Sequence, residues 1–204
     1  MDIELQKLYD DLGTGWKDPN IEEKLKKLKL APDHKYLDRA NQLKYKRDLI
    51  NYQFKEYKGS GKKVLDISAG SGCFVEVMKY FGCKAIGTDS PTCKYKPFTK
   101  SQGVYVVYFD TNVVPYPFAD KSYHLVCCTG AITFVTKIPW TWVLDEMFRI
   151  AKETVYIAVN VGENFDANKH LIDGYKKEGW ELVLKPDGTN ASKYKWVKNK
   201  SKSK

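Results

Sequence analysis

The spacing of apolar residues along the chain changes near Gly61. Before this point apolar positions recur at helical intervals, which predicts a helix over residues 3–12 and a longer helix further on. Asp33 is a candidate N-cap for the longer helix, and Gly59 and Gly61 are expected to end it. The apolar stripes of both helices are too thin to bury themselves. We therefore expect residues 1–60 to form an N-terminal helical appendage.

After Gly61, short apolar runs alternate with helical stripes. Strands are expected at 64–67, 84–88, 104–109, 124–128 and 154–159, and helices at 74–81, 143–151 and 166–177. Two further strands, 181–184 and 194–197, flank a turn-rich segment and indicate an antiparallel hairpin. Alternating strands and helices are typical of a parallel sheet covered on both faces. The pattern predicts an α/β three-layer sandwich, whose mostly parallel sheet of seven strands ends in a C-terminal antiparallel hairpin.

The positive charge of the chain is concentrated at its C-terminal end. The formal net charge is +9, and residues 185–204 hold seven Lys and one Asp, a net of +6. Residues 199–204 are expected to be a basic disordered tail behind the predicted domain, which covers residues 61–198. Such a tail raises the affinity for any polyanion without making a recognition surface. Nucleic acid therefore stays open as a partner, through this Lys-rich end.

Apolar runs and cysteines indicate the compartment. No apolar run is long enough to cross a bilayer, and the N-terminus lacks the pattern of a signal peptide, so we expect a cytoplasmic protein with no membrane partner. The five cysteines are odd in number and none forms a C-x-x-C pair, so we expect no disulfide framework and no metal site. Cys127 and Cys128 lie in an apolar run and are expected to be buried thiols. The sequence leaves the oligomeric state open.

The segment Val-Leu-Asp-Ile-Ser-Ala-Gly-Ser-Gly-Cys-Phe, residues 64–74, joins the first predicted strand of the domain to a helix. In a parallel α/β sheet ligands bind beyond the carboxyl end of this strand, and Gly and Ala let a cofactor approach the backbone. Val75 stands where a dinucleotide fingerprint has its third glycine, and the Gly-Lys-Ser/Thr ending of a P-loop is missing. Asp66 would repel a pyrophosphate, but it can meet the amino group of an amino-acid moiety.

A second acid stands at the end of the next predicted strand. Asp89 follows Gly72 by 17 residues, and a carboxylate at this position can accept hydrogen bonds from both hydroxyls of a ribose. A helix cap or turn before Pro91 is the structural alternative for Asp89. Two acids at successive strand ends, with one helix between them, favour a ligand site over two unrelated structural roles.

These segments together resemble class I S-adenosylmethionine-dependent methyltransferases. Residues 64–74 resemble motif I of that family, and Gly-Thr-Asp-Ser at 87–90 resembles motif II. Residues 115–126, Pro-Tyr-Pro-Phe-Ala-Asp-Lys-Ser-Tyr-His-Leu-Val, are similar to the "LPF-D-SFD-V" stretch of the family's small-molecule branch, and residues 142–152 are similar to its "L-E--R-LK" helix. The resemblance spans residues 62–160 at motif level. It implies a Rossmann-like fold, with S-adenosylmethionine as the cofactor.

The resemblance also implies a role for each matching residue. The methionine part of the cofactor would be held by Asp66 and by the backbone of Ser68, Ala69, Gly70 and Gly72. The ribose hydroxyls would bind Asp89, with Ser90 beside it. The adenine amino group would bind Asp110, with Thr111 adjacent, and Thr129 would border the sulfonium.

Two positions depart from the family pattern. Ser68 replaces the usual first glycine of motif I, which requires a backbone that avoids conformations only glycine accepts easily. His124 stands where an Asp is common at the start of the fourth strand, a position that is usually structural. These departures leave room for a non-catalytic protein that keeps the cofactor fold as a scaffold.

The sequence does not identify a catalytic base. Methyl transfer is an attack on an activated methyl group, so positioning supplies much of the catalysis, and a base helps when the nucleophile is a hydroxyl or a protonated amine. His34 and His170 are loose candidates, and each is more typical of a surface histidine. The loop after the fourth strand, with Thr129 and Thr133, is expected to face the substrate.

The methyl acceptor is open as well. The Asn/Asp-Pro-Pro-Tyr/Phe signature of adenine or glutamine amino-group methylation and the Pro-Cys nucleophile of cytosine-C5 methylation are absent, and no large recognition domain is inserted. A small molecule or a sugar-containing metabolite, methylated on O or N, is therefore the favoured acceptor. A nucleic acid or a protein is the second interpretation, with the Lys-rich end supplying nonspecific affinity that falls steeply with salt.

Overall fold

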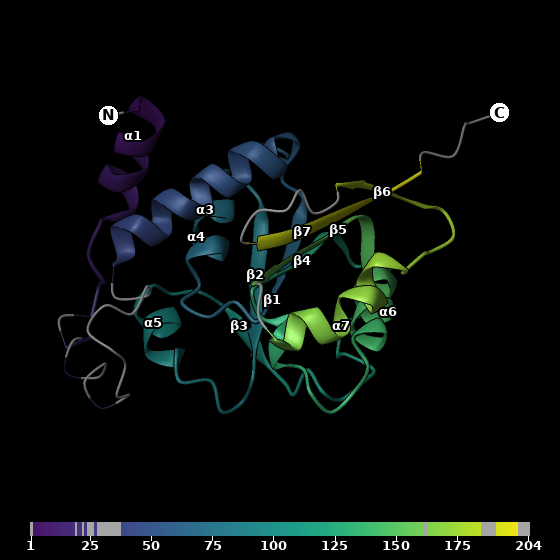
Figure 1. The fold of residues 1–204 in the computed structure, drawn as a ribbon. Coiled ribbons are helices and arrows are strands. Elements are labelled where there is room, and N and C mark those ends of the chain that lie inside the picture. The colour runs from purple at the N-terminus through teal and green to yellow at the C-terminus, as the bar shows by residue number, and fades with distance from the viewer. Residues whose placement is uncertain are drawn as a thin grey trace. The chain divides into compact units, whose positions relative to one another are not determined.

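A computed structural model describes residues 2–18, 20, 21, 23, 27, 38–160, 163–184 and 191–199 (Figure 1). The chain divides into two compact units. The first combines residues 1–62 with 69–108, and the second combines residues 63–68 with 109–204. His34 and residues 200–204, for which the sequence carries predictions, lie outside the described residues. The division into an appendage of residues 1–60, a domain of 61–198 and a tail stays a prediction.

The first unit contains the N-terminal helices and two strands. Its elements are α1 (Ile3–Leu12), α3 (Arg39–Gln53), the 3-10 helix η1 (Lys55–Tyr57), α4 (Cys73–Tyr80), β2 (Lys84–Asp89), α5 (Lys96–Ser101) and β3 (Val106–Tyr108). The helix predicted over residues 3–12 is confirmed, with the Asp2 side chain capping it through the amide of Glu4. The sequence did not predict α5, because six residues without an apolar stripe give no periodic signal.

The longer N-terminal helix, α3, has different ends from those predicted. Its N-cap is Asp38, whose side chain accepts a hydrogen bond from the amide of Asn41, and not Asp33, which lies outside the described residues. The helix ends at Gln53, before Gly59. The reason is Phe54, which leaves the helical backbone with φ −136° and is fully buried.

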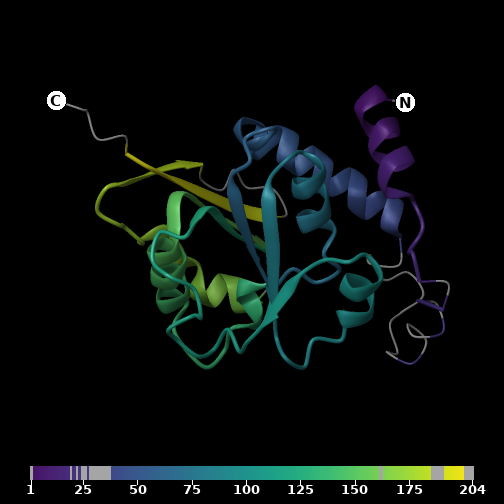
Figure 2. The same cartoon turned by 180° about the vertical axis from the view of Figure 1, so that it is seen from behind.

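A buried ion pair joins α3 to α4. The two helices pack together, and α1 lies beside α3 (Figures 1 and 2). Arg39, in the first turn of α3, donates to both carboxylate oxygens of Glu76 on α4, at 2.7 and 3.1 Å, and both side chains are buried. Because a buried charge is costly without its partner, this pair fixes where α3 sits on α4.

The second unit contains the remaining strands and two helices. Its elements are β1 (Lys63–Ile67), β4 (Tyr123–Thr129), the 3-10 helix η2 (Ile132–Phe134), α6 (Trp140–Ile150), β5 (Ala151–Asn160), α7 (Glu163–Asp173), β6 (Trp180–Leu184) and β7 (Ala191–Lys198). Helix α6 packs against β4 and β5 and contacts α7 (Figure 1). The apolar face of α6, with Val143, Leu144 and Met147, is buried there.

The strands form one sheet in the order β3-β2-β1-β4-β5-β7-β6. Strands β2 and β3, β1 and β4, and β4 and β5 pair in parallel, whereas β7 runs antiparallel to both β5 and β6. The predicted fold class, a mostly parallel seven-stranded sheet with a C-terminal antiparallel hairpin, is confirmed. In this order the carboxyl ends of β1 and β4 lie side by side, with Asp66 opposite Cys127.

Two predicted boundaries in the second unit are wrong. Ala151 was expected in a helix, but it opens β5 with φ −78° and ψ 141°, directly after α6 ends. Helix α7 ends at Asp173 rather than at residue 177, because Tyr175 leaves the helix to stack on Phe148, with ring centroids 5.3 Å apart. Within the described residues, no helix is long and apolar enough to cross a membrane.

Candidate functional site

The glycine turn after β1 is shaped by residues with positive φ. Ser68, Gly70 and Gly72 have φ values of 59°, 57° and 83°. Gly72 also precedes α4 as its N-cap, and a Cβ placed on it would lie 3.2 Å from the side chains of Thr99 and Val104. The turn therefore needs glycine at position 72 for its conformation and for the space around it.

The expectation for Ser68 is wrong, because its backbone is left-handed, a conformation that an L side chain adopts at a cost. The next residue is held tightly: the amide of Ala69 donates to the carbonyl of Thr88 at 2.8 Å. Ala69 also passes over Gly87, where an added Cβ would lie only 2.6 Å from the Cβ of Ala69. The contacts of Ala69 with β2 thus hold the residue that directly follows Ser68.

Asp89, the last residue of β2, is bonded to the glycine turn. Its Oδ2 accepts a hydrogen bond from the amide of Gly70 at 3.0 Å, and its Oδ1 accepts one from the amide of Ser90 at 2.8 Å. The side chain is half-buried. Each carboxylate oxygen can accept two hydrogen bonds, so these two bonds alone do not saturate it. The structure therefore brings together Gly70, Asp89 and Ser90, three of the residues predicted for the cofactor.

Cys93 is a neighbour of Asp89 that the sequence analysis missed. Its sulfur accepts a hydrogen bond from the amide of Tyr95 at 3.3 Å. Burial, and then the nearby Asp89 carboxylate, raise the pKa of the Cys93 thiol to about 12. The thiol therefore stays protonated at neutral pH and is a poor nucleophile. A lone cysteine in a loop carries no sequence pattern that would have placed it beside Asp89.

Asp66 lies deep in the sheet of the second unit. Its side chain is 1% exposed, and its Oδ1 lies 3.5 Å from the sulfur of Cys127, the residue opposite it on β4. Cys127 and Cys128 are buried, as predicted. Asp66 therefore lies at the buried end of β1, and its role toward the methionine part of the cofactor stays a prediction.

Asp110 follows β3 and Phe109, and its carboxylate is exposed. Its Oδ1 accepts two hydrogen bonds from one residue, Asn112, whose amide N lies at 2.9 Å and whose Nδ2 lies at 3.0 Å. These bonds, together with the charge of Lys137, hold the pKa of Asp110 below its ordinary value. Asp110 is therefore ionised at neutral pH, and both of its carboxylate oxygens are hydrogen-bond acceptors.

The residues after Asp110 are held by α6. Tyr116 is buried, its hydroxyl donates to the carbonyl of Thr111 at 2.9 Å, and its amide donates to Oε2 of Glu146 at 2.6 Å. Arg149, one turn further along α6, donates to the carbonyl of Tyr116 at 3.0 Å and bonds both oxygens of Glu146. The family-like motifs at 115–126 and 142–152 thus meet in space.

Three further predicted residues, Thr129, His124 and His170, lie on β4 and α7 of the second unit. Thr129 ends β4, is half-buried, and is followed by Gly130, whose amide donates to the carbonyl of Ala158 at 2.6 Å. His124 has a structural contact, because its Nδ1 accepts a hydrogen bond from the amide of Lys63 at 3.1 Å. His170 is exposed on α7. Within the described part of the chain, these contacts identify no catalytic base.

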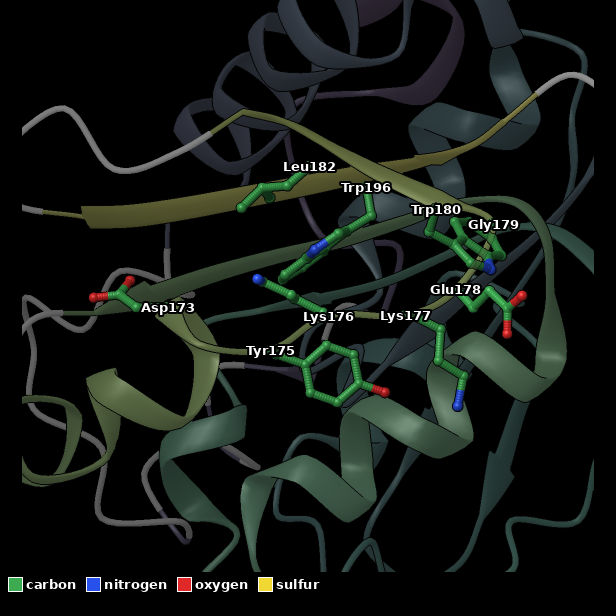
Figure 3. Close-up of a pocket in the computed structure, with 9 residues that line it drawn as sticks. All are labelled: Asp173, Tyr175, Lys176, Lys177, Glu178, Gly179, Trp180, Leu182 and Trp196. Carbon is green, nitrogen blue, oxygen red and sulfur yellow. The ribbon is translucent and has the colours of Figure 1, made fainter.

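The second unit also has a pocket of about 480 Å³, shown in Figure 3. The residues around it come from the end of α7, the segment between α7 and β6, and the strands β6 and β7, and they are Asp173, Tyr175, Lys176, Lys177, Glu178, Gly179, Trp180, Leu182 and Trp196. The residues predicted to bind the cofactor all lie elsewhere in the chain. We therefore do not assign the cofactor to this pocket.

The sheet order, with its antiparallel C-terminal strands, defines a Rossmann-like fold. Residues 65–159 match a family described as "Methyltransferase domain". These residues form a class I S-adenosylmethionine-dependent methyltransferase domain, and S-adenosylmethionine is its cofactor. No curated protein sequence matches the chain.

Solved structures share the fold at low sequence identity. Magnesium protoporphyrin IX methyltransferase from Synechocystis, solved with S-adenosylmethionine, is 10% identical with a TM-score of 0.59, covering 98% of this chain and 99% of that one. A candidate RNA methyltransferase from Pyrococcus horikoshii is 16% identical with a TM-score of 0.59, covering 99% and 100%. An S-adenosylmethionine-dependent methyltransferase from Archaeoglobus fulgidus is 17% identical with a TM-score of 0.55, covering 78% and 94%. At these identities the likeness establishes the fold alone.

Proposed function

We propose that this methyltransferase moves the methyl group of S-adenosylmethionine to an oxygen or nitrogen of a small molecule or sugar-containing metabolite. The observation that carries the cofactor assignment is the Asp89 carboxylate, which is bonded to the amide of Gly70 in the glycine turn. A carboxylate fixed in this way is preorganised to accept hydrogen bonds from a ribose diol. Cytoplasmic location remains a prediction from the sequence.

The acceptors along the strand ends match the donors of the cofactor. We assign the ribose diol to Asp89 with Ser90, and the ammonium group to Asp66 with the turn from Ser68 to Gly72. We assign the adenine amino group to Asp110 with Thr111, and we place Thr129 at the border of the sulfonium. These carboxylates would repel the phosphates of a dinucleotide. When bound, the cofactor supplies the activated methyl group, and these residues hold and orient it.

The choice of acceptor class rests on weaker support. The strongly basic segment, residues 185–204, is confined to one end of the chain, which disfavours a dedicated nucleic-acid surface on the body of the protein. The solved structures of this fold include a methyltransferase named for a porphyrin and a candidate RNA methyltransferase, so the fold itself does not choose. A nucleic-acid or protein acceptor is the second candidate, supported by the seven lysines of that segment.

The cofactor assignment is tested by isothermal titration with S-adenosylmethionine and S-adenosylhomocysteine. Asp89→Asn should weaken binding about tenfold or more, because a hydrogen bond to a charged acceptor is worth about 1.5–3 kcal/mol. Glu181→Gln is the matched control, since it removes one exposed carboxylate from β6. Wild-type protein that binds neither ligand would contradict the proposal and favour a non-catalytic scaffold.

The acceptor class is tested with S-adenosylmethionine that carries a labelled methyl group. The protein is incubated with separate small-metabolite, RNA and protein fractions, and the label is followed into each. Label in the metabolite fraction supports the proposal. Label confined to the RNA or to the protein fraction would overturn it, and a steep loss of RNA labelling as salt rises would show that contacts to phosphates hold the RNA.

A further inference from the structure

The side chain of Asn112 bonds to two segments of the second unit. Its Nδ2 and its own backbone amide donate to Oδ1 of Asp110, at 3.0 and 2.9 Å. Its Oδ1 accepts hydrogen bonds from the amides of Thr136 and Lys137, at 3.1 and 3.0 Å. The second pair of partners lies 24 and 25 residues further along the chain. One half-buried side chain therefore connects the loop after β3 with the segment after η2.

These contacts fix the orientation of the Asn112 amide. Rotating it by half a turn would place its oxygen against the Asp110 carboxylate and its NH₂ group against two N–H donors. Both contacts would then be repulsive, so a single orientation satisfies all of the partners. With both acceptor positions of Oδ1 in use, the side chain has little freedom left.

The orientation of Asn112 determines that of the Asp110 carboxylate. The terminal torsion of an aspartate is otherwise broad, and Asp110 is exposed, so packing does not select one rotamer. Both hydrogen bonds from Asn112 end on Oδ1, which leaves Oδ2 to a ligand. From the opposite end of the loop, the Tyr116 hydroxyl holds the carbonyl of Thr111.

The other partner of Asn112 is the segment at 130–137, which continues from Thr129. The indole nitrogen of Trp140 donates to the carbonyl of Val135 at 3.0 Å, so α6 holds the same segment. In the proposed function Thr129 borders the methyl group. Asn112 thus ties the residue expected at the adenine to the segment expected at the acceptor.

We propose that Asn112 is a positioning residue for cofactor recognition, which aims Oδ2 of Asp110 at the adenine amino group and couples that contact to residues 136 and 137. This inference rests on the proposed role of Asp110. It makes a specific demand: without Asn112, the protein should lose part of its discrimination between an amino group and a carbonyl at the purine 6-position. General damage to the fold would weaken every ligand alike.

The experiment compares the affinities for S-adenosylhomocysteine and S-inosylhomocysteine, in which a carbonyl oxygen replaces the adenine amino group. Wild-type protein should prefer S-adenosylhomocysteine by about tenfold or more, the value of one hydrogen bond to a charged group. Asn112→Ala should lower that ratio, because only the backbone amide of residue 112 then still holds Oδ1 of Asp110, and Asp110→Asn should bring the ratio close to one. Asn51→Ala, which removes an asparagine side chain from α3 in the first unit, is the matched control and should keep the ratio.

Asn112→Asp separates the two halves of the proposal. The substituted carboxylate can still accept from the amides of Thr136 and Lys137, but it no longer donates to Asp110 and repels it. Hydrogen exchange at those two amides should therefore stay slow in Asn112→Asp and become faster in Asn112→Ala, while the ligand ratio falls in both.

Each negative result of this experiment leads to a different conclusion. Wild-type protein that binds no S-adenosylhomocysteine refutes the proposed function itself. Binding without preference for the amino group refutes the role of Asp110, and with it this inference. A preserved ratio in both Asn112 variants, in protein that still binds, shows that Asn112 only supports the fold.

Discussion

The glycine turn and the loop after β3 both carry residues expected to hold the cofactor, yet different forces hold them. The turn is fixed mainly by backbone contacts, which are positive φ at Ser68 and Gly72, a hydrogen bond from the Ala69 amide to β2 and a close passage over Gly87, with a side-chain contact from Asp89. The Asp110 loop is fixed by side chains that come from elsewhere, such as Glu146 on α6. A backbone-held turn constrains residue types locally, whereas a side-chain-held loop depends on partners distant in the sequence.

The largest effect on stability should come from Gly87→Ala, which adds a methyl group on β2 against the backbone-held turn. The new Cβ would lie 2.6 Å from the Cβ of Ala69, so the turn or the strand has to shift. We expect a loss of about 3 kcal/mol in the free energy of unfolding, at the upper end of overpacking costs, and a marked loss of affinity for S-adenosylhomocysteine. Urea unfolding and calorimetric titration measure the two effects.

Gly15→Ala is the control for Gly87→Ala. No atom lies within 4 Å of a Cβ at Gly15, and its backbone φ is outside the left-handed region. The substitution should change stability by less than about 0.5 kcal/mol and leave affinity unchanged. Equal stability of the Gly87 and Gly15 variants would show that close packing does not hold the turn.

Glu146→Gln tests the side-chain-held loop, because it replaces the carboxylate on α6 that holds the loop. With its oxygen in the place of Oε2, glutamine still accepts from the Tyr116 amide and from Arg149 Nη2, but its NH₂ group then faces Arg149 Nε, so we expect a loss of about 2 kcal/mol at pH 7. Affinity for S-adenosylhomocysteine should fall with it, because Arg149 also holds the carbonyl of Tyr116 in the loop. Full stability with full affinity would contradict this account of the loop.

The same variant should change the pH dependence of unfolding. Burial alone would raise the pKa of Glu146, but hydrogen bonds from Arg149 and the Tyr116 amide outweigh it and hold the pKa below its ordinary value of 4.5. A lowered pKa contributes stability above the unfolded value that is lost as the pH falls through the folded one. Between pH 6 and pH 3, Glu146→Gln should therefore lose less stability than wild-type protein.

This contrast also explains what could be predicted from the sequence. Gly72 and Asp89 lie in short sequence patterns, because the geometry of the turn requires glycine and the end of the strand places the acid. The alternation of strands and helices was enough to predict the sheet. Asn112 stands in no such pattern, because its partners are set by folding 24 and 25 residues away. The early end of α7 is similar: Tyr175 stacks on Phe148, a contact that helical periodicity does not encode.

A smaller effect separates two buried tryptophans of the second unit. The Trp140 indole nitrogen donates to the carbonyl of Val135, whereas that of Trp196 is buried and has no hydrogen-bond partner among the residues that the structure describes. Trp140→Phe should cost about 1–2 kcal/mol beyond the volume lost, because it leaves a carbonyl unsatisfied, and Trp196→Phe should cost only the volume. Equal losses in urea unfolding would mean that the Trp140 bond does not hold the segment at 130–137.

The smallest effect, and one of opposite sign, is expected at Ser68. Its φ of 59° costs an L residue about 1–2 kcal/mol, while glycine adopts it freely but loses about 0.5–1 kcal/mol more conformational entropy on folding. Ser68→Gly should therefore stabilise the protein by about 0.5 kcal/mol without weakening S-adenosylhomocysteine binding, and Ser68→Val should destabilise it. A destabilised Ser68→Gly variant would mean that the serine hydroxyl holds the turn, which would make this turn side-chain-held like the loop after β3.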